Sequence, residues 1–416
     1  MTGMDFVAEA KPLLDQAVAV SGVFGLGMCF AMLGSISVKL MPRLNINEGK
    51  FGTLVSAFMF TCLITSLIMG VLVDNIGYQP VGVAGFLIVA FCLFLLSRSK
   101  NFGAAVIACL LLGFGAMALN TIGNGLLGQV LYEGKNPPAA FNIGNIFFGL
   151  GLFITPFLIS FLFRKMSFGG AVTMLGLIPL VLTVIPAMAP LSGYGGGKFD
   201  VEIVGSLLVQ PATIAAALAL FCYIAMEASF CNWLAPYGKE VIKAGKPEAP
   251  DDAVDASAQR MLSVFAIAMM AGRLVNGLLL ADIKEISDNS QYIITGAAVV
   301  AAVVILMMIV SKKSGVAWIA AALSGFVFGP CFPTVLGISA PKYNDAYWAT
   351  NFGIIFAVGL AGAVFVPKLM GNLAAKGEGS SIQKSLKLLL PLCIILAVLA
   401  IWLATAGVSG EVAAKP

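Results

Sequence analysis

Twelve apolar segments, each long enough to cross a bilayer as a helix, dominate this sequence. A transmembrane helix needs about 20 apolar residues, whereas a strand of a membrane barrel needs only about 10, with alternating polarity. The segments therefore predict an all-α integral membrane protein with 12 transmembrane helices. They lie near residues 17–41, 51–73, 80–98, 104–131, 139–163, 168–190, 206–236, 259–281, 291–311, 315–339, 348–371 and 385–407.

Composition restricts the chemistry that such a chain can perform. Hydrophobic residues make up 60% of the chain and charged residues 11%, and there is no histidine. The eight cysteines lie inside the apolar segments without a C-x-x-C spacing, so metal-binding and haem chemistry are not expected. We expect no enzyme activity, no cofactor and no nucleic-acid partner. The longest clearly polar stretch, 246–259, predicts a flexible loop.

A short motif recurs at an offset close to half the chain. N-x-G-x-I-F begins at Asn142 and again at Asn351, 209 residues later, and each copy is followed by glycines and a proline. Two weaker echoes have nearly the same offset: GVLVD at 70–74 with GLLLAD at 277–282, and LLLGFG at 110–115 with ALSGFVFG at 322–329. Several matches at one offset indicate a duplicated unit.

The duplication predicts two six-helix, pseudo-symmetric halves. We expect an N-terminal half over 1–190, a central loop over 191–205 and a C-terminal half over 206–416.

Glu227 is the only carboxylate well inside an apolar segment. An acidic residue at the centre of a membrane helix costs about 2.5–3.5 kcal/mol to insert, so such groups usually face a cavity or a partner. Because desolvation favours the neutral form, Glu227 is suited to take up and release a proton. Tyr223 lies one turn earlier on the same helical face. A carboxylate beside an aromatic ring is typical of sugar-binding sites.

Four asparagines extend this candidate site. Asn120 and Asn124 share one helix face, and Asn142 and Asn145 can both point inward from the next helix. Each residue also fits a structural role, because amides bridge packed membrane helices and a buried carboxylate can clamp a neighbouring helix. Both interpretations remain open at the level of sequence.

The stretch 70–77 resembles a family signature. It contains Gly70, Asp74 and Gly77 in the pattern G-x-L-x-D-x-x-G, which is similar to the motif between helices 2 and 3 of the major facilitator superfamily. The resemblance implies the major facilitator fold, with a central cavity between the two halves. It also implies a tight turn whose carboxylate caps or clamps a neighbouring helix end and latches one conformation.

Within that superfamily the chain resembles the fucose–glucose–galactose symporter family. Three stretches carry the resemblance: LNTIGNG at 119–125 with the later F-N pair at 141–142, Y-x-x-x-E-x-x-x-x-N-W-L at 223–234, and GPCFPT at 329–334. It implies a substrate site on helices 1, 4, 5, 7 and 10. The candidate substrate-binding residues are Glu227, Tyr223, Asn232, Trp233, Asn120, Asn124, Asn142, Asn145, Phe332 and Asn351.

This sequence departs from the fucose permease pattern at two carboxylates. Val38 and Asn120 occupy the matching positions on helices 1 and 4, which leaves Glu227 as the one residue placed to couple transport to protons.

Arg273 is the other charged residue well inside a segment. At about 1.5 Å rise per residue, its depth differs from that of Glu227 by roughly 10 Å along the membrane normal. A direct pair is therefore not expected. We expect Arg273 to join the latch near the turn between helices 8 and 9, with Asp282 or Asp345 as partner, although it could instead reach the cavity.

The loop charges oppose the orientation that the superfamily implies. Six Lys and Arg residues lie on the side of the termini and seventeen on the other, whereas cytoplasmic loops usually carry the excess. The superfamily resemblance implies a plasma (inner) membrane protein with both termini cytoplasmic. The charge rule alone would place both termini outside.

The function expected from these features is secondary active transport of a sugar or similar small polar solute by alternating access. Proton-coupled symport through Glu227 is the leading mode, with sodium as the other candidate ion. Facilitative uniport is an alternative, and so is a drug or metabolite antiporter with a cavity lined by Met28, Phe30, Met32, Phe328 and Phe332. A receptor without transport is the remaining class. We expect a monomer in the lipid bilayer.

Overall fold

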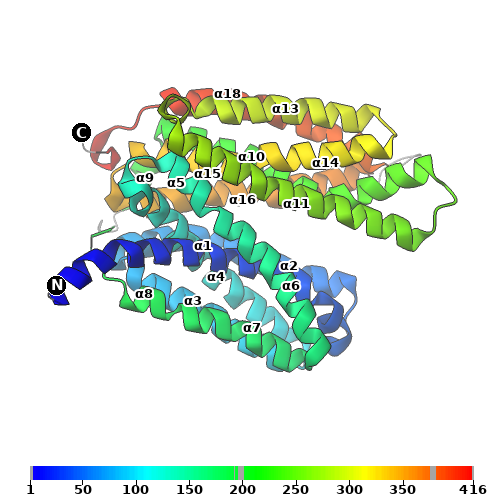
Figure 1. The fold of residues 1–416 in the computed structure, drawn as a ribbon, viewed down its shortest axis with the longest axis horizontal. Coiled ribbons are helices and arrows are strands. Elements are labelled where there is room, and N and C mark those ends of the chain that lie inside the picture. The colour runs from blue at the N-terminus through cyan, green and yellow to red at the C-terminus, as the bar shows by residue number, and fades with distance from the viewer. Residues whose placement is uncertain (1–2, 192, 195–200, 375–380, 415–416) are drawn as a thin grey trace.

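The computed structural model describes residues 3–191, 193–194, 201–374 and 381–414. Within these residues, 12 helical spans are long and apolar enough to cross a membrane, which confirms the predicted number. The chain is a multi-pass membrane protein. Its spans form two six-helix halves, one above the other in Figure 1.

The N-terminal half contains six spans, of which the fifth and sixth are each built from two helices. Its helices are α1 (Gly3–Leu44), α2 (Glu48–Ile76), α3 (Tyr78–Arg98), α4 (Phe102–Val130), the short η1 (Leu131–Gly134), α5 (Pro137–Gly144), α6 (Ile146–Lys165), α7 (Phe168–Leu182) and α8 (Val184–Met188).

The C-terminal half also contains six spans within the described residues. Its helices are α9 (Val201–Leu208), α10 (Pro211–Gly245), α11 (Asp251–Asp282), α12 (Lys284–Asp288), α13 (Gln291–Val310), α14 (Ser314–Phe328), α15 (Cys331–Ser339), η2 (Ala340–Lys342), η3 (Asp345–Tyr347), α16 (Trp348–Ala374), α17 (Ile382–Ser385), η4 (Leu386–Leu388), α18 (Leu389–Thr405) and η5 (Gly410–Val412).

Two loop expectations need correction. The stretch 246–259 is helical from Asp251 onwards, because acidic residues favour a helix N-terminus and two of them pair with α10. Lys243 lies 2.8 Å from Asp251, and Lys239 lies 2.8 Å from Asp255. The expected central loop, 191–205, contains the start of α9, while residues 192 and 195–200 lie outside the described residues. The boundaries of the two halves stay a prediction.

The fifth and tenth spans are interrupted near the middle of the molecule. Asn145 separates α5 from α6, and Gly329 with Pro330 separates α14 from α15. Proline has no backbone N–H, so Pro333 cannot bond the carbonyl of Gly329 four residues earlier. The break therefore leaves a carbonyl that a side chain can use.

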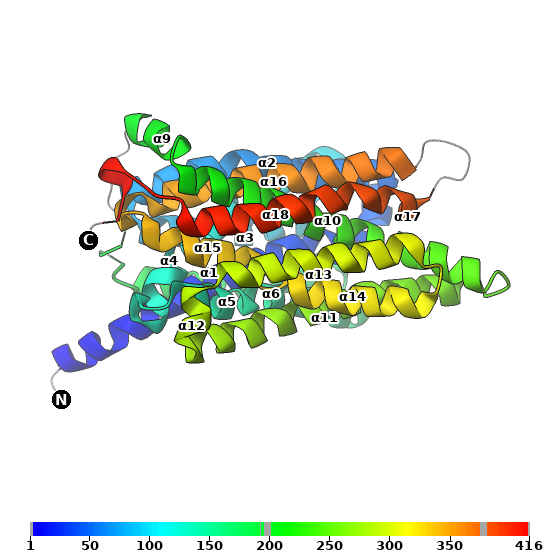
Figure 2. The same ribbon diagram turned by 90° about the horizontal axis from the view of Figure 1, so that it is seen from above.

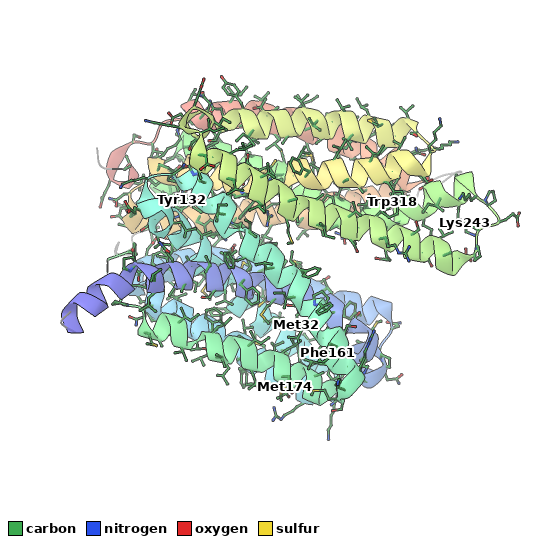
Figure 3. The ribbon with its side chains drawn as sticks, viewed as in Figure 1. Met32, Tyr132, Phe161, Met174, Lys243 and Trp318 are labelled. Atoms are coloured by element: carbon green, nitrogen blue, oxygen red, sulfur yellow. The ribbon has the colours of Figure 1, made fainter. Side chains whose placement is uncertain are left out.

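Both termini lie at one end of the molecule, which we call the terminal end; the opposite end is the open end (Figures 1 and 2). The two halves touch near the terminal end and diverge toward the open end (Figure 1). Figure 3 shows Tyr132 near the terminal end and Lys243 at the open end.

Two helix contacts join the halves near the terminal end. In the first, α2 packs against α16. A Cβ at Gly70 would lie 2.3 Å from the carbonyl oxygen of Ala349, and a Cβ at Gly353 would lie 2.4 Å from that of Ser66. Only glycine allows this approach.

In the second contact, α5 packs against α11 and α15. The contact is equally close, because a Cβ at Gly337 would lie 2.4 Å from Cα of Pro138. Both contacts hold the terminal end closed.

Candidate functional site

Glu227 lies in α10, and 19% of its side chain is exposed. Tyr223, one turn earlier, is fully buried, interacts electrostatically with Glu227, and packs edge-to-face on Phe328 with ring centroids 6.3 Å apart. The Tyr223 hydroxyl interacts with the Glu227 carboxylate but makes no hydrogen bond of ordinary geometry among the described residues. The sequence-predicted pair is thus together.

Arg273 lies beside Glu227, contrary to the sequence expectation. Its Nη2 is 4.0 Å from Oε1 of Glu227, and only 3% of the arginine side chain is exposed. The expectation failed because α10 and α11 run in opposite directions and side chains lean toward the N-terminus of their own helix. Glu227 leans toward the terminal end and Arg273 toward the open end, so the two lean toward each other.

The guanidinium of Arg273 also bonds both helix breaks. Nε donates to the carbonyl of Gly329 at 3.0 Å, and Nη1 donates to the carbonyl of Asn145 at 3.1 Å. Gly329 belongs to the same half as Arg273, whereas Asn145 belongs to the other. The GPCFPT motif thus provides an acceptor for a buried cation.

Aromatic rings of the N-terminal half cover the other side of this group. The Phe148 ring lies 5.5 Å from the guanidinium carbon of Arg273, a cation–π distance. Phe30 packs edge-to-face on Phe148 at 6.0 Å and on Phe58 at 5.4 Å. Glu227 and Arg273 therefore form a charged pair between aromatic clusters from both halves.

Three of the predicted asparagines form one buried hydrogen-bonded chain. Asn124 donates to the side-chain oxygen of Asn120 at 2.9 Å, and Asn145 donates to that of Asn124 at 2.9 Å. These hydrogen bonds connect α4 to the helix break at Asn145, whose backbone carbonyl accepts a hydrogen bond from Arg273. These amides orient the break rather than face open space, since all three are buried.

Asn142 reaches into the other half. Its Nδ2 donates to Thr334 Oγ1 at 3.0 Å, and Asn276 donates to the Asn142 side-chain oxygen at 3.1 Å. Sequence reasoning did not single out Thr334 or Asn276. Thr334 lies in the GPCFPT motif and Asn276 lies three residues after Arg273, one turn along the same helix face, which was the available signal.

The other predicted binding residues lie away from Glu227. Asn232 is exposed and donates to the carbonyl of Ala228 in its own helix at 2.7 Å. The Trp233 indole donates to the carbonyl of Pro367 at 3.0 Å, inside the C-terminal half.

Phe332 and Asn351 are both buried. Phe332 packs edge-to-face on Phe356 at 6.0 Å, and Asn351 accepts a hydrogen bond of 2.8 Å from Thr213. Asn142 and Asn351, the equivalent residues of the two repeats, therefore differ: the first bridges the halves and the second stays within one.

The turn between α2 and α3 has the geometry expected of a clamp. Oδ2 of the buried Asp74 accepts a hydrogen bond of 2.8 Å from the backbone N–H of Thr350, in the first turn of α16. Gly77 has φ +85°, a backbone conformation that favours glycine. The interaction joins the two halves at the terminal end, and its role as a latch stays a prediction.

The prediction that Arg273 pairs with Asp282 or Asp345 in this latch is wrong. Arg273 bonds the two helix breaks and faces Glu227 instead. Asp282 is exposed at the C-terminus of α11, nine residues along the helix from Arg273.

A family model described as "Major Facilitator Superfamily" matches residues 19–367, most of the chain. The chain belongs to the major facilitator superfamily.

Solved structures of the superfamily have the same fold. The fucose:proton symporter FucP of E. coli matches with a TM-score of 0.71 and 16% identity, over 93% of this chain and 98% of that one. FucP "in the outward conformation" matches with a TM-score of 0.72 and 16% identity, over 94% of this chain and 99% of that one. The proton:xylose symporter XylE, bound to 6-bromo-6-deoxy-D-glucose, matches with a TM-score of 0.70 and 12% identity, over 94% of this chain and 95% of that one. No curated protein matches this chain in sequence.

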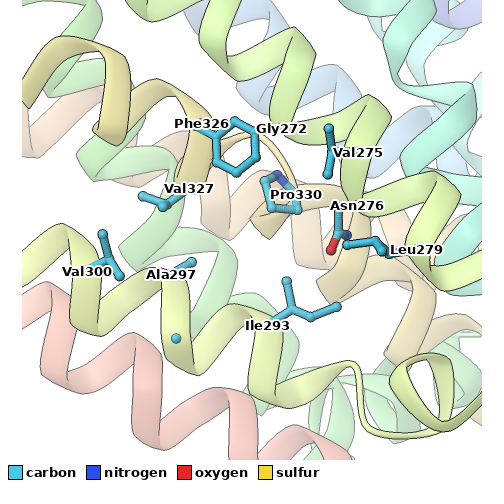
Figure 4. Close-up of a pocket in the computed structure, with 11 residues that line it drawn as sticks. Gly272, Val275, Asn276, Leu279, Ile293, Ala297, Val300, Phe326, Val327 and Pro330 are labelled. Carbon is cyan, nitrogen blue, oxygen red and sulfur yellow. The ribbon is translucent and has the colours of Figure 1, made fainter. Parts of the chain in front are cut away.

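A small pocket lies between α11, α13 and α14, beside the helix break at Pro330 (Figure 4). Asn276 is its one polar side chain, and the other lining residues are apolar: Gly272, Val275, Leu279, Ile293, Gly296, Ala297, Val300, Phe326, Val327 and Pro330. The pocket contains neither Glu227 nor Arg273, so it is separate from the charged pair.

The wide Met- and Phe-lined cavity considered for an antiporter has little support from these side chains. Met28, Met32, Phe328 and Phe332 are all buried in the packing of the helices. Phe30 is half-buried within the aromatic cluster that also contains Phe148.

Proposed function

We propose that this superfamily member transports a sugar or a similar small polar solute by alternating access. The observation that carries the proposal is the position of Glu227: a partly exposed carboxylate, paired with Arg273, where the two halves meet. A solute that bonds this pair contacts one half directly and the other through the Asn145 carbonyl. Rocking of the halves about this point then exposes the solute to each side in turn.

The chemistry of the pair supports a hydroxylated solute. The 4.0 Å between Nη2 of Arg273 and Oε1 of Glu227 exceeds a hydrogen bond, so both groups keep bonding capacity. A hydroxyl group can donate to the carboxylate and accept from the guanidinium. The neighbouring rings of Tyr223 and Phe148 suit the apolar face of a sugar. Of the solved relatives named above, FucP is a fucose:proton symporter and XylE a proton:xylose symporter.

Glu227 is our candidate for proton coupling. Its charged form is tolerated while water reaches it from the open end, and its neutral form is better suited to an occluded site. A proton bound with the solute would then let both cross together. Sodium-coupled transport and uniport are the alternatives that the experiment below separates.

We also propose that both termini lie in the cytoplasm, as in the superfamily, and that the open end faces outward across a plasma (inner) membrane. The basic residues of the open end oppose this assignment under the positive-inside rule.

Uptake into proteoliposomes tests the proposal directly. The purified protein is reconstituted and offered a panel of labelled sugars and polyols under an inward pH gradient, an inward sodium gradient, or neither. Accumulation that requires the pH gradient supports proton symport, and equilibration without accumulation supports uniport. If no member of the panel enters while hydrophobic cations exchange, the sugar assignment is wrong and the antiporter alternative replaces it.

A further inference from the structure

Arg273 joins three separate parts of the molecule through one rigid group. Its guanidinium faces Glu227 in α10, bonds the carbonyl of Gly329 in its own half, and bonds the carbonyl of Asn145 in the other half. We infer that Arg273 is a positioning residue that links the charge state of Glu227 to the contact between the two halves. The inference rests on the proposed function, because it assumes that Glu227 gains and loses a proton during transport.

The two residues differ in exposure. The Glu227 side chain is 19% exposed, whereas that of Arg273 is 3% exposed, so Glu227 is the more accessible of the two to a proton or a solute. The bond from Arg273 to the Asn145 carbonyl links this pair to the opposite half.

Arg273 is bonded across a surface that has to move. Asn145 lies at the α5–α6 break, and close to it α6 packs on α11: a Cβ at Gly149 would lie 2.5 Å from Cγ of Met270. Phe148 of the same segment contacts the guanidinium. When the halves rock, α6 shifts against α11, and the bond from Nη1 of Arg273 to the Asn145 carbonyl stretches or breaks.

Charge balance predicts how protonation of Glu227 changes the stability of the described conformation. A buried cation is stable only when it is paired and hydrogen-bonded, and Glu227 supplies the negative charge near Arg273. Protonation of Glu227 removes that charge and leaves the guanidinium with two carbonyls and one ring. The described conformation thereby loses stability relative to one in which water or a solute reaches Arg273. Protonation is thus expected to shift the halves away from the arrangement in Figure 1.

The other titratable groups near the pair are neutral at physiological pH. Tyr223 and Cys231 of α10 and Cys331 of α15 interact with Glu227, and all three ordinarily lose a proton only above about pH 8. From α6, the facing residues are Asn145 and Phe148, which do not titrate. The buried carboxylate of Asp74, which joins the halves at the terminal end, is another group that titrates between them, and Asp74→Asn removes its contribution. The part of the pH response that remains in Asp74→Asn and is lost in Glu227→Gln is assigned to Glu227, transmitted by Arg273.

Distance measurements between spin labels test this link without any solute. Labels are attached at Lys100→Cys, between α3 and α4, and at Lys312→Cys, between α13 and α14, both exposed at the open end, in a Cys231→Ser background. Double electron–electron resonance is recorded between about pH 5 and about pH 8. With wild-type Arg273, acid is expected to increase the population of the shorter distance at least about threefold, which reflects the loss of a charged partner.

Variants at position 273 distinguish a role of Arg273 in the pH response from a purely structural role. Arg273→Gln is expected to abolish the pH response although Glu227 is present, and Arg273→Lys to retain part of it, because lysine keeps the charge but not the three-way bonding. Arg260→Gln, exposed on the same helix, is the matched control and should respond as the wild type does. Melting of each variant shows whether it folds. If Arg273→Gln fails to fold, Arg273→Lys and Glu227→Gln carry the test.

Two results would overturn the inference: no pH response in the wild type, or a response in Arg273→Gln equal to that of the wild type while Glu227→Gln has none. Neither depends on finding the solute, so failure of the proposed transport would appear separately, as absent uptake by the wild type.

Discussion

The carboxylate of Asp74, in the N-terminal half, lies 2.8 Å from the backbone nitrogen of Thr350, in the C-terminal half, and accepts its hydrogen bond. Because Thr350 is in the first turn of α16, a negative charge meets the positive end of a helix dipole. Because the interaction joins the two halves, we expect it to be lost when the terminal end opens and so to stabilise the closed conformation.

Asp74→Asn should therefore weaken closure of the terminal end. Asparagine can still accept the bond from Thr350, but the charge–dipole attraction, about 0.3–2 kcal/mol, is lost. The population open at the terminal end should rise by roughly 2- to 30-fold, as measured by spin-label distances across that end. Asp288→Asn, exposed at the same end, serves as the control. An unchanged distribution in Asp74→Asn would remove Asp74 from the latch.

Gly70→Ala should separate α2 from α16. The added Cβ would lie 2.3 Å from the carbonyl oxygen of Ala349, and overpacking of this kind costs about 1–3 kcal/mol. We expect slower transport and fewer molecules closed at the terminal end. The matched control is Gly52→Ala in the same helix, where a Cβ meets nothing within 4 Å. Equal transport rates for the two variants would contradict the close contact.

Thr334→Val should destabilise the contact between α5 and α11. Valine keeps the shape of threonine but removes the oxygen that accepts from Asn142 and, at 3.5 Å, from Asn276. Leaving buried donors unsatisfied costs about 1–3 kcal/mol. The melting temperature of the purified protein should fall, whereas Thr405→Val, exposed at the end of α18, should leave it unchanged. A fall of the same size in both variants would mean that the amide cluster adds no stability.

Cys231 offers a native probe of the open end. It is the one exposed thiol of the eight cysteines, all of which lie in the described residues, and it is one turn from Glu227. A membrane-impermeant maleimide should label one thiol per chain, and a bound solute should slow the reaction. In intact cells, labelling from outside supports cytoplasmic termini. Labelling only from the cytoplasmic side would reverse the orientation, in agreement with the loop charges.

The fold was predictable because its determinants are local or repeated. Segment length fixes the number of helices, and the recurrence at Asn142 and Asn351 indicates the duplication. The clamp at Asp74 was predictable from its glycine spacing together with the family resemblance. Glu227 and Tyr223 were predictable because one helical turn joins them.

The partners of Arg273 were not predictable in the same way. Estimating depth from residue number treats side chains as points on straight vertical helices, whereas Arg273 and Glu227 lean toward each other from antiparallel helices. Nor does hydropathy reveal that the break before Pro330 presents a carbonyl to a cation. Asn142 and Asn351 have different hydrogen-bond partners because their helices contact different halves. A sequence repeat alone does not specify those contacts.

Solute accumulation by Glu227→Gln tests the central claim most directly. The variant keeps the size of the side chain and removes its titration, so proteoliposomes are compared for accumulation under a pH gradient and for exchange without one. We predict that Glu227→Gln loses gradient-driven accumulation but retains exchange of solute. Full accumulation with the pH dependence of the wild type would contradict the assignment of proton coupling to Glu227.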